Sequence, residues 1–397
     1  MEKRKKKNKR GTRRQSKRKE PQMPKNAKSS KGGCVCVDDA GSAFDLCYHP
    51  PFDRSLSGRA FNCSQLPYLK RLRLFDTHGL VDLASHDLPD PVFVTGCSSN
   101  HFGEELRLIA SLQKHFPSGR IVFYDLGLVE LEVDKVKNFC NVEYRRFETQ
   151  RYPRHVGVLS EYRWKPLIIA EAVAEFGAIW WMDSSVLFES ADLERVYALL
   201  KCKRRDPTER KALHDWVERA AQTALKDNTL KQLSKIGWDI PQWNSSIQNC
   251  DKSEYLLHGW TGHGILSATR PEVYEFFPVE ETKLKGETAK MFEAGFAFVV
   301  RTREVVDDVL KWYVMCALEK GCMAPPGSTA SCRFAANDRY ATFADCHRFD
   351  QSVINVLLAN KYHSRRKFWT SEIVDFFKII RGGTAESPPR VCRRRRL

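Results

Sequence analysis

Long apolar runs are absent from this sequence of 397 residues. No window approaches the roughly 18 apolar residues of a membrane-spanning helix, and no apolar signal-peptide core follows the basic start. We therefore expect no transmembrane segment in this chain, and neither an anchor nor a signal in the sequence given. Internal repeats, paired Cys-x-x-Cys spacings, and RNP, KH and zinc-finger patterns are also missing, which argues against common repeat, zinc and RNA-binding modules.

Acidic residues are scarce only near the two ends of the chain. Residues 1–32 contain 15 Lys and Arg against two Glu, and the last eight residues contain five Arg, in a chain of net charge +16. The remainder holds 45 basic and 47 acidic residues and is close to neutral. We predict a disordered basic tail over residues 1–33, a basic C-terminal tail over 381–397, and no nucleic-acid binding by the folded body.

The basic N-terminal tail has three interpretations. It is a solvated arm, a nuclear-localisation or nucleic-acid arm, or a polybasic segment next to a membrane. The sequence leaves these alternatives open, and with them a nuclear or cytoplasmic location.

Cysteines are plentiful, at 13, and eight of them form two clusters in loop-rich segments. The clusters are Cys34, Cys36, Cys47 and Cys63, and then Cys316, Cys322, Cys332 and Cys346. Such clusters predict disulfides of a secretory protein, and zinc binding is the alternative. The sequons at Asn62 and Asn244 agree with a secretory route, and the odd count leaves at least one thiol unpaired.

Strand and helix patterns alternate after a cysteine-containing lead-in, residues 34–90, with one expected helix near "LPYLKRLRLFD". Strands are expected at 91–99, 119–127, 142–147 and 178–183, with helices at 103–116, 130–139 and 162–177 between them. Further helices are expected at 193–202, within 203–236, and at 304–320 and 350–362; a loop, strand and helix are expected at 259–278, and one strand at 291–302. The alternation predicts an α/β fold with a mostly parallel sheet and helices on both faces.

The stretch "AIWWMD" places one carboxylate, Asp183, directly after a strand without polar residues. A central parallel strand is buried on both faces and need not alternate. Ligands in such sheets bind beyond the carboxyl ends of the strands. Polar residues at the ends of the first two strands are expected on the same rim: Thr95, Ser98, Ser99, Asn100 and Asp125.

Four stretches resemble one known family. They are "VFVTGCSSNHFGEELRLIASLQKHFPSGRIVFYDLGL", "EYRWKPLIIAEAVAEFGAIWWMDSSVLF", "TGHGILSATRPEVYEFFP" and "CHRFDQSVINVLLANKY". In order and spacing, over roughly residues 60–362, they are similar to the nematode-expanded family DUF1647, which is grouped with nucleotide-diphospho-sugar transferases of the GT-A fold. The resemblance implies a GT-A-like, Rossmann-like domain over residues 91–380.

The resemblance implies a donor site at the strand ends. Such enzymes hold Mn²⁺ or Mg²⁺ with Asp-x-Asp, and the matching triplet here, Asp183-Ser184-Ser185, lacks the second carboxylate. Lys165 is expected to face the donor diphosphate. The expected donor-binding residues are Thr95, Ser98, Asn100, Asp125, Lys165, Asp183 and Ser185.

The resemblance also implies an acceptor site. Glu293 and Asp350 are the expected catalytic carboxylates, and His263, Gly295 and Gln351 are expected to bind the acceptor. His347 is expected to join Asp183 as a metal ligand. The alternatives are a turn cap for Asp183, a solvated helix position for Lys165, a surface position for Glu293, a helix cap for Asp350 and a structural role for either histidine.

The expected function is that of a hexosyltransferase-like enzyme with Mn²⁺ or Mg²⁺ as cofactor. It would move a sugar from a UDP- or GDP-linked donor to a hydroxyl group of a glycan or glycoprotein in the secretory pathway, in the Golgi lumen. Two alternatives remain: an inactive GT-A-like binding domain, motivated by the missing carboxylate, and a nuclear or nucleic-acid-binding protein, motivated by the tails.

Overall fold

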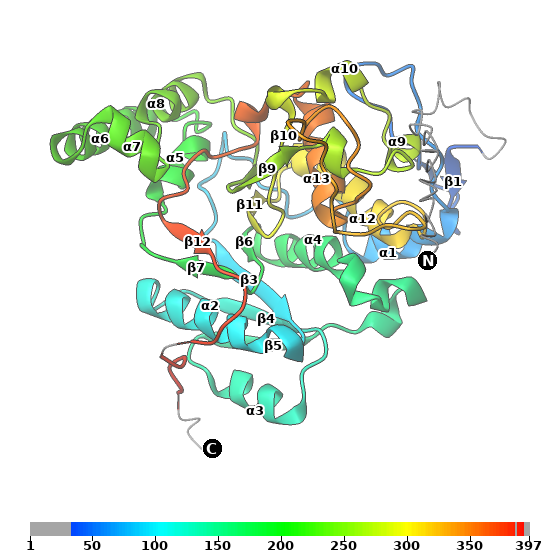
Figure 1. Cartoon of the computed structure of the whole chain (residues 1–397), viewed down its shortest axis with the longest axis horizontal. Coiled ribbons are helices and arrows are strands. Elements are labelled where there is room, and N and C mark those ends of the chain that lie inside the picture. Colours follow the sequence, from blue (N-terminus) through cyan, green and yellow to red (C-terminus); the bar gives the residue numbers. More distant parts are fainter. Residues whose placement is uncertain (1–32, 386, 393–397) are drawn as a thin grey trace, which may run out of the picture.

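The computed structural model describes residues 33–385 and 387–392 (Figure 1). The basic tail predicted for residues 1–33 therefore lies, apart from Gly33, outside the described residues. The four arginines at 393–396 lie outside them as well.

Six strands form the central sheet, in the order β5 (Val142–Arg146), β4 (Ile121–Asp125), β3 (Val92–Cys97), β6 (Ala178–Met182), β11 (Phe296–Val300) and β8 (Tyr255–Leu257). Strands β5, β4, β3 and β6 run parallel, whereas β11 is antiparallel to both β6 and β8. The predicted α/β class and mostly parallel sheet are confirmed. The antiparallel edge was not predicted.

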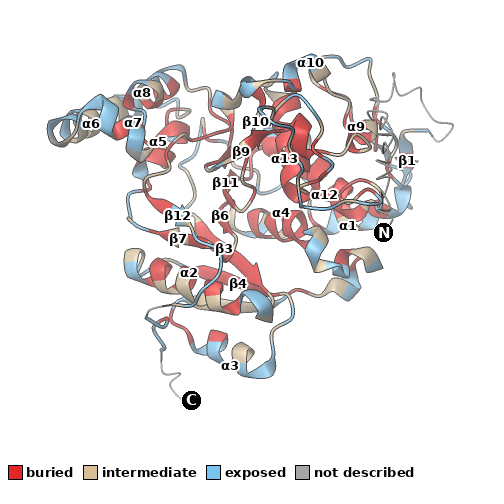
Figure 2. Ribbon diagram, in the orientation of Figure 1, coloured by how far each residue is buried: buried red, intermediate tan, exposed pale blue. Residues whose placement is uncertain are grey.

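The apolar strand β6 is buried on both faces of this sheet. Ile179 and Trp181 join a core with α4 (Trp164–Phe176), α12 (Lys311–Leu318) and α13 (Asp350–Lys361). Trp180 and Met182 join a second core with α2 (Phe102–His115) and α5 (Glu194–Lys201). The predicted helices on both faces are therefore present, and Figure 2 shows the buried sheet between them.

The cysteine-containing lead-in packs against the main body. It contains β1 (Val35–Val37), β2 (Ala43–Asp45) and α1 (Leu66–Arg71), so the expected helix is present. Tyr48 meets the ring of Trp312 edge-on, with 5.2 Å between the ring centroids. Residues of the lead-in share one core with α12, and the domain bounds 34–90 and 91–380 stay predictions.

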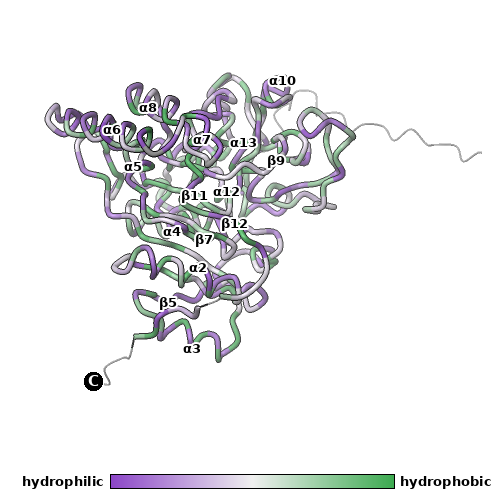
Figure 3. The backbone as a smooth tube through the Cα atoms, turned by 60° about the vertical axis from the view of Figure 1, so that its left-hand side comes forward, coloured by the Kyte–Doolittle hydropathy of each residue, from purple (hydrophilic) through white to green (hydrophobic). Residues whose placement is uncertain are grey.

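Three helices after α5 extend to one end of the molecule: α6 (Pro207–Asp227), α7 (Leu230–Ile236) and α8 (Ile240–Asn249) (Figure 1). The side chain of Asp206 caps α6, and Thr229 forms a capping box with Gln232 at the start of α7. Hydrophilic and hydrophobic colours alternate along these helices in Figure 3, as expected for half-exposed helices.

The stretch 291–302 contains two strands, whereas one was expected. β10 (Lys290–Phe292) pairs with β9 (Trp260–Gly264), and the chain then turns at residues 293–295 before β11. Glu293 donates its backbone N–H to the carbonyl of Gly259, and Gly295 accepts one from Asp183. These two hydrogen bonds direct the turn toward the end of β6.

The remaining elements are short or follow expectation. The helix α3 (Glu130–Asn138) covers β5. Two short helices, α9 (Val273–Phe276) and α10 (Glu281–Leu284), follow β9. The expected helix at 304–320 consists of α11 (Arg303–Val305), a π-helical turn (Val306–Leu310) and α12. β7 (Val186–Phe188) pairs with β12 (Phe377–Ile379). Single 3-10 turns lie at Cys63–Gln65, Ser99–His101, Thr149–Arg151, Arg154–Gly157, Leu159–Glu161, Leu266–Ala268, Glu287–Ala289 and Arg366–Phe368.

Six disulfides join 12 of the 13 cysteines: Cys34–Cys47, Cys36–Cys63, Cys140–Cys392, Cys202–Cys250, Cys316–Cys322 and Cys332–Cys346. Cys97 is the free thiol. The predicted disulfides and the one unpaired cysteine are confirmed. Because the clustered cysteines are bonded to one another, they are not available as zinc ligands.

The described residues 381–385 and 387–392 contact the body, although a tail was expected from residue 381. Gly382 donates its N–H to Glu104, and Cys392 is bonded to Cys140 beside α3. Within residues 33–392, no helix has the length and apolar character needed to cross a bilayer.

Candidate active site

A cavity of about 670 Å³ opens at the carboxyl ends of β3 and β6. One side, here called the strand-end wall, consists of residues 96–98, 100, 101, 104 and 183–186. The opposite side, the loop wall, consists of residues 293–295 and 348–351. This position agrees with the rule that α/β sheets bind ligands beyond the ends of their parallel strands.

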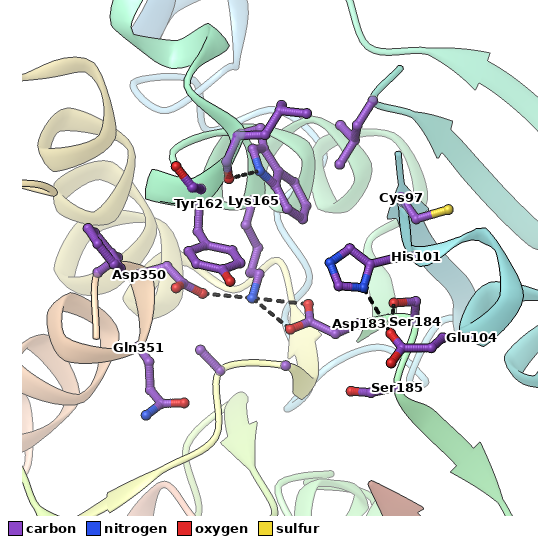
Figure 4. Close-up of a pocket in the computed structure, with 18 of the residues that line it drawn as sticks. Cys97, His101, Glu104, Tyr162, Lys165, Asp183, Ser184, Ser185, Asp350 and Gln351 are labelled. Atoms are coloured by element: carbon purple, nitrogen blue, oxygen red, sulfur yellow. Dashed lines mark hydrogen bonds and ion pairs between the residues drawn. The ribbon is translucent and has the colours of Figure 1, made fainter. Parts of the chain in front are cut away.

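Asp183 lies in the middle of the cavity, immediately after β6 (Figure 4). Its carboxylate accepts hydrogen bonds from the indole N–H of Trp181 at 3.2 Å and from the ammonium group of Lys165 at 3.1 Å. Its backbone N–H donates to the carbonyl of Gly295 at 2.7 Å. The carboxylate is therefore fixed from the sheet, from α4 and from the loop wall.

Lys165 joins the two walls. Its ammonium nitrogen lies 3.0 Å from an oxygen of Asp183 and 2.7 Å from an oxygen of Asp350, and its side chain is 3% exposed. Burial by itself lowers the pKa of Lys165, but the two carboxylates outweigh burial and raise the pKa above its ordinary value. The rings of Tyr162, Trp164 and Trp181 surround the ammonium group within 6 Å. Lys165 is consequently a permanent cation.

Asp350 begins α13 on the loop wall, and only 5% of its side chain is exposed. Burial raises the pKa of this carboxyl group, and the attraction of Lys165 opposes that rise. The preceding residue, Phe349, has φ 47° and ψ −118°, a conformation that costs energy for a residue with a side chain. The surrounding structure thus holds Asp350 in position through a strained turn.

Gly295 allows the loop wall to approach Asp183 closely. A Cβ atom at this position would lie 2.7 Å from Oδ2 and 3.0 Å from Cγ of Asp183. Any larger residue would displace the carboxylate from Lys165 or move the loop. Gly295 was predicted to bind the acceptor, and the structure shows that the residue it approaches is Asp183.

Glu104 adds a second carboxylate to the strand-end wall. It accepts hydrogen bonds from the hydroxyl of Ser184 at 3.2 Å and from the backbone N–H of Gly382, and its other partner is His101 at 3.0 Å. Burial raises the pKa of Glu104, but these hydrogen bonds outweigh burial and lower it. Glu104 is therefore an ionised group that joins α2, the end of β6 and the C-terminal segment.

Glu105, the neighbour of Glu104, points away from the cavity into the protein. It is fully buried and accepts a hydrogen bond from the hydroxyl of Thr95 at 3.1 Å. Burial raises the pKa of Glu105 to about 8. Thr95, predicted to contact the donor, is committed to Glu105 and does not line the cavity.

Asp125 also lies outside the cavity lining, although a donor contact was predicted for it. Its carboxylate accepts hydrogen bonds from the backbone N–H groups of Gly127 and Leu128 and from the hydroxyl of Tyr144. These contacts shape the turn after β4, which is the usual role of an Asp at such a position.

Neither predicted histidine lines the cavity. His347 is fully buried; one ring nitrogen lies 3.0 Å from the carbonyl oxygen of Met323, and the other 3.4 Å from the backbone nitrogen of Arg270. Burial lowers the pKa of His347 to about 3 and that of His263 to about 4. With both of its nitrogens engaged, His347 has no free ligand atom for a metal.

The other predicted residues do line the cavity. Ser98, Asn100, Lys165, Asp183 and Ser185 of the donor set are present, as are Glu293, Gly295, Asp350 and Gln351 of the acceptor and catalytic sets. Glu293 is 16% exposed and pairs with Arg381 at 3.2 Å. Their roles stay predictions, and the structure establishes only that they share one cavity.

Several cavity residues were not predicted, among them His101, Glu104, Tyr162, Arg348 and Arg381. His101 and Glu104 stand at the start of α2, next to the predicted Asn100, and their spacing of three on a helix could have indicated them. No local pattern singles out Arg348 or Arg381, because their place depends on the fold of distant segments.

The residues around Asp183 do not fit the expected Mn²⁺ or Mg²⁺. Such ions take several oxygen ligands, whereas Asp183 is the single carboxylate of its triplet and is occupied by Lys165 and Trp181. Among the described residues, the group of three close potential ligands is Cys34, Asp45 and Cys47, of which the two cysteines form a disulfide. The metal stays a prediction that this geometry does not favour.

Comparison with known proteins adds two findings. Residues 34–170 match the family model described as "Protein of unknown function (DUF1647)", in agreement with the resemblance seen in the sequence. A sequence search of curated proteins found no match.

Similar solved structures include three glycosyltransferase structures. An active-site mutant of LgtC is 14% identical with a TM-score of 0.26, and the match covers 56% of this chain and 58% of that one. The bifunctional glycosyltransferase WbbM is 11% identical with a TM-score of 0.34, and the match covers 71% of this chain and 39% of that one. Galactosyltransferase LgtC with donor and acceptor sugar analogues is 12% identical with a TM-score of 0.32, and the match covers 73% of this chain and 87% of that one. The chain thus spans less than two thirds of the first two, and at these TM-scores its function has to be argued from its own residues.

Proposed function

We propose that the cavity binds a nucleotide sugar, UDP- or GDP-linked, and that the protein transfers the sugar to a hydroxyl group of a glycan or glycoprotein. The observation that supports this most is the triad Asp183–Lys165–Asp350, a buried cation held between two carboxylates in a large cavity at the ends of parallel strands. Buried charges arranged in this way are typical of functional sites.

The reaction joins the acceptor oxygen to the anomeric carbon of the sugar and breaks the bond between that carbon and the diphosphate. The acceptor proton goes to a carboxylate, and the diphosphate leaves with the bonding electron pair. Asp350 and Glu293 are the two candidates for the base, since both line the loop wall. Lys165 and its partner Asp183 would face the leaving group, where a fixed cation stabilises the developing negative charge.

The secretory pathway, and within it the Golgi lumen, is the compartment that we propose. Six disulfides support an oxidising environment, because such bonds do not persist in a reducing cytosol.

The test is the release of UDP or GDP from a panel of nucleotide sugars, with and without Mn²⁺, measured for the wild type and Asp183→Asn. The variant removes the charge that orients Lys165, and we expect about a 100-fold loss of turnover. Asp39→Asn, at an exposed position of the lead-in, is the control and should retain full turnover.

A folded wild type that binds none of these donors would contradict the proposal. That result would favour the second candidate function, an inactive domain that binds other molecules. The missing second carboxylate of the Asp183-Ser184-Ser185 triplet motivates this alternative.

A further inference from the structure

Three permanent cations line the cavity, and two of them are paired with carboxylates. Lys165 is held by Asp183 and Asp350, and Arg381 by Glu293. The third is Arg348. In the part of the chain that the structure describes, its guanidinium group donates one hydrogen bond, to the carbonyl of Ala330 at 3.2 Å, and forms no ion pair.

The backbone fixes the place of Arg348 in the loop wall. Its N–H donates to the hydroxyl of Ser352 at 3.0 Å, and the strained residue Phe349 follows it. Two residues earlier, Cys346 is bonded to Cys332. A long, charged side chain therefore starts from a rigid point, half-buried at the edge of the cavity, which favours a specific contact over a solvated surface position.

A guanidinium group without a carboxylate partner is suited to an anion. Its planar fork can donate two parallel hydrogen bonds to a phosphate group. Lys165 lies in the same cavity, but its three N–H donors face three carboxylate oxygens, two of Asp183 and one of Asp350, so its charge is already compensated. Arg348 therefore supplies the uncompensated positive charge of the cavity that a diphosphate can meet.

We infer that Arg348 binds the diphosphate of the donor directly and that no divalent metal ion is needed for this binding. The inference rests on the proposed function, since it assigns the diphosphate of a nucleotide sugar to the cavity. It follows from two observations: the residues around Asp183 do not fit a metal ion, and Arg348 is a cavity cation without a carboxylate partner. In this arrangement a fixed side-chain cation supplies the positive charge that a metal ion supplies to the diphosphate in other enzymes.

The experiment measures the affinities of UDP, GDP and inorganic pyrophosphate by calorimetry, once in EDTA and once with Mn²⁺. We expect the dissociation constant of UDP or GDP to differ by less than threefold between the two buffers. Arg348→Gln should weaken the binding of that nucleotide and of pyrophosphate by 10- to 100-fold, and Arg348→Lys should weaken it less, because Lys keeps the charge and loses the fork.

Arg333→Gln is the matched control. Arg333 belongs to the same loop, is exposed and does not line the cavity, so this variant removes the same charge from a neighbouring place. It should bind like the wild type. Circular dichroism and a thermal melt confirm that each variant is folded.

Three outcomes would overturn the inference. Binding that requires Mn²⁺ would show that a metal ion neutralises the diphosphate. Equal binding by Arg348→Gln and the wild type would show that Arg348 does not contact the ligand. Neither of these two results would contradict the proposed function. No binding of any probe in either buffer would contradict the inference and the proposed function together. Metal-free pyrophosphate binding that depends on Arg348, without any turnover of nucleotide sugars, would support the anion site and contradict the transferase.

Discussion

The two walls of the cavity are built in different ways. The strand-end wall follows directly from β3 and β6, whose backbone hydrogen bonds and two-sided burial set the position of Asp183. The loop wall comes from the turn between β10 and β11 and from the long connection between Leu318 and Asp350. This connection contains the disulfide Cys332–Cys346 and the strained Phe349, and Cys316–Cys322 ties it to α12. One wall is thus positioned by regular structure, and the other by disulfides, by the backbone hydrogen bonds of Glu293 and Gly295, and by the ammonium group of Lys165.

Lys165 is the strongest link between the walls, and its replacement should have the largest effect. Lys165→Met leaves the buried carboxylate of Asp350 without a cation, which typically costs about 3–5 kcal/mol of unfolding free energy. Urea unfolding measures the loss. The double variant Lys165→Met/Asp350→Asn removes the buried charge as well and should regain part of the stability.

A Lys165→Met variant within 1 kcal/mol of the wild type would contradict this role. It would mean that the walls are held together without their ionic contact. If the double variant were as unstable as Lys165→Met, the lost unfolding free energy would come from packing around the three aromatic rings rather than from the unpaired charge.

The disulfides offer a matched comparison between the loop wall and the lead-in. Cys332–Cys346 and Cys34–Cys47 close loops with sequence separations of 14 and 13 residues. Replacing either pair with serine should cost about 3 kcal/mol, because loops of this length have similar closure entropies. Thermal unfolding measures both losses.

Ligand binding should separate the two disulfide variants. Cys332→Ser/Cys346→Ser frees the backbone next to Arg348, so the affinity for UDP or GDP should fall at least tenfold, whereas Cys34→Ser/Cys47→Ser should bind like the wild type. Equal binding by both would show that the loop wall keeps its shape without the crosslink.

The strand-end wall has a pH-dependent group, Glu105, beneath it, and its effect on stability is the smallest of the three when the pH changes by one unit. Burial raises the pKa of Glu105 to about 8 from an ordinary value of 4.5, so between these pH values the folded state binds a proton that the unfolded chain releases. Stability should therefore fall as pH rises through this window, with a slope of up to about 1.4 kcal/mol per pH unit.

Urea unfolding of the wild type and Glu105→Gln at pH 5, 6.5 and 8 isolates this contribution. The amide cannot ionise, so the variant should gain stability relative to the wild type as pH rises. Glu130→Gln, at the exposed start of α3, is the control. Parallel profiles for Glu105→Gln and the wild type would show that Glu105 keeps an ordinary pKa.

The strand-end wall could be predicted from the sequence because its signals are local. The apolar run 178–182, the helical spacing of 162–177 and the polar residues at strand ends depend on neighbours along the chain. The one-carboxylate triplet at Asp183 was visible in the same way. Spacing along the chain does not reveal that Thr95 is hydrogen-bonded to Glu105 and that Asp125 is hydrogen-bonded within a turn.

The loop wall could not be placed in this way. The break at Glu293–Gly295 depends on hydrogen bonds to Gly259 and Asp183, which are distant in sequence. Cysteine spacing indicates disulfides without giving their pairing, so the position of Arg348 stayed hidden. His347 looked like a ligand in the sequence, and only the fold shows that both of its ring nitrogens are engaged.

The bond between Cys140 and Cys392 has a mechanical consequence. It spans 252 residues and closes β6, β11, α13 and the whole loop wall into one covalent ring. If the protein were pulled from residue 34 and residue 392, tension would pass through the crosslink and load only the segment before Cys140, including β3 and β4. The backbone of the ring would not be stretched between the two points, although β6 would still hold β3 through its hydrogen bonds. A single cut within the ring would leave both pieces attached.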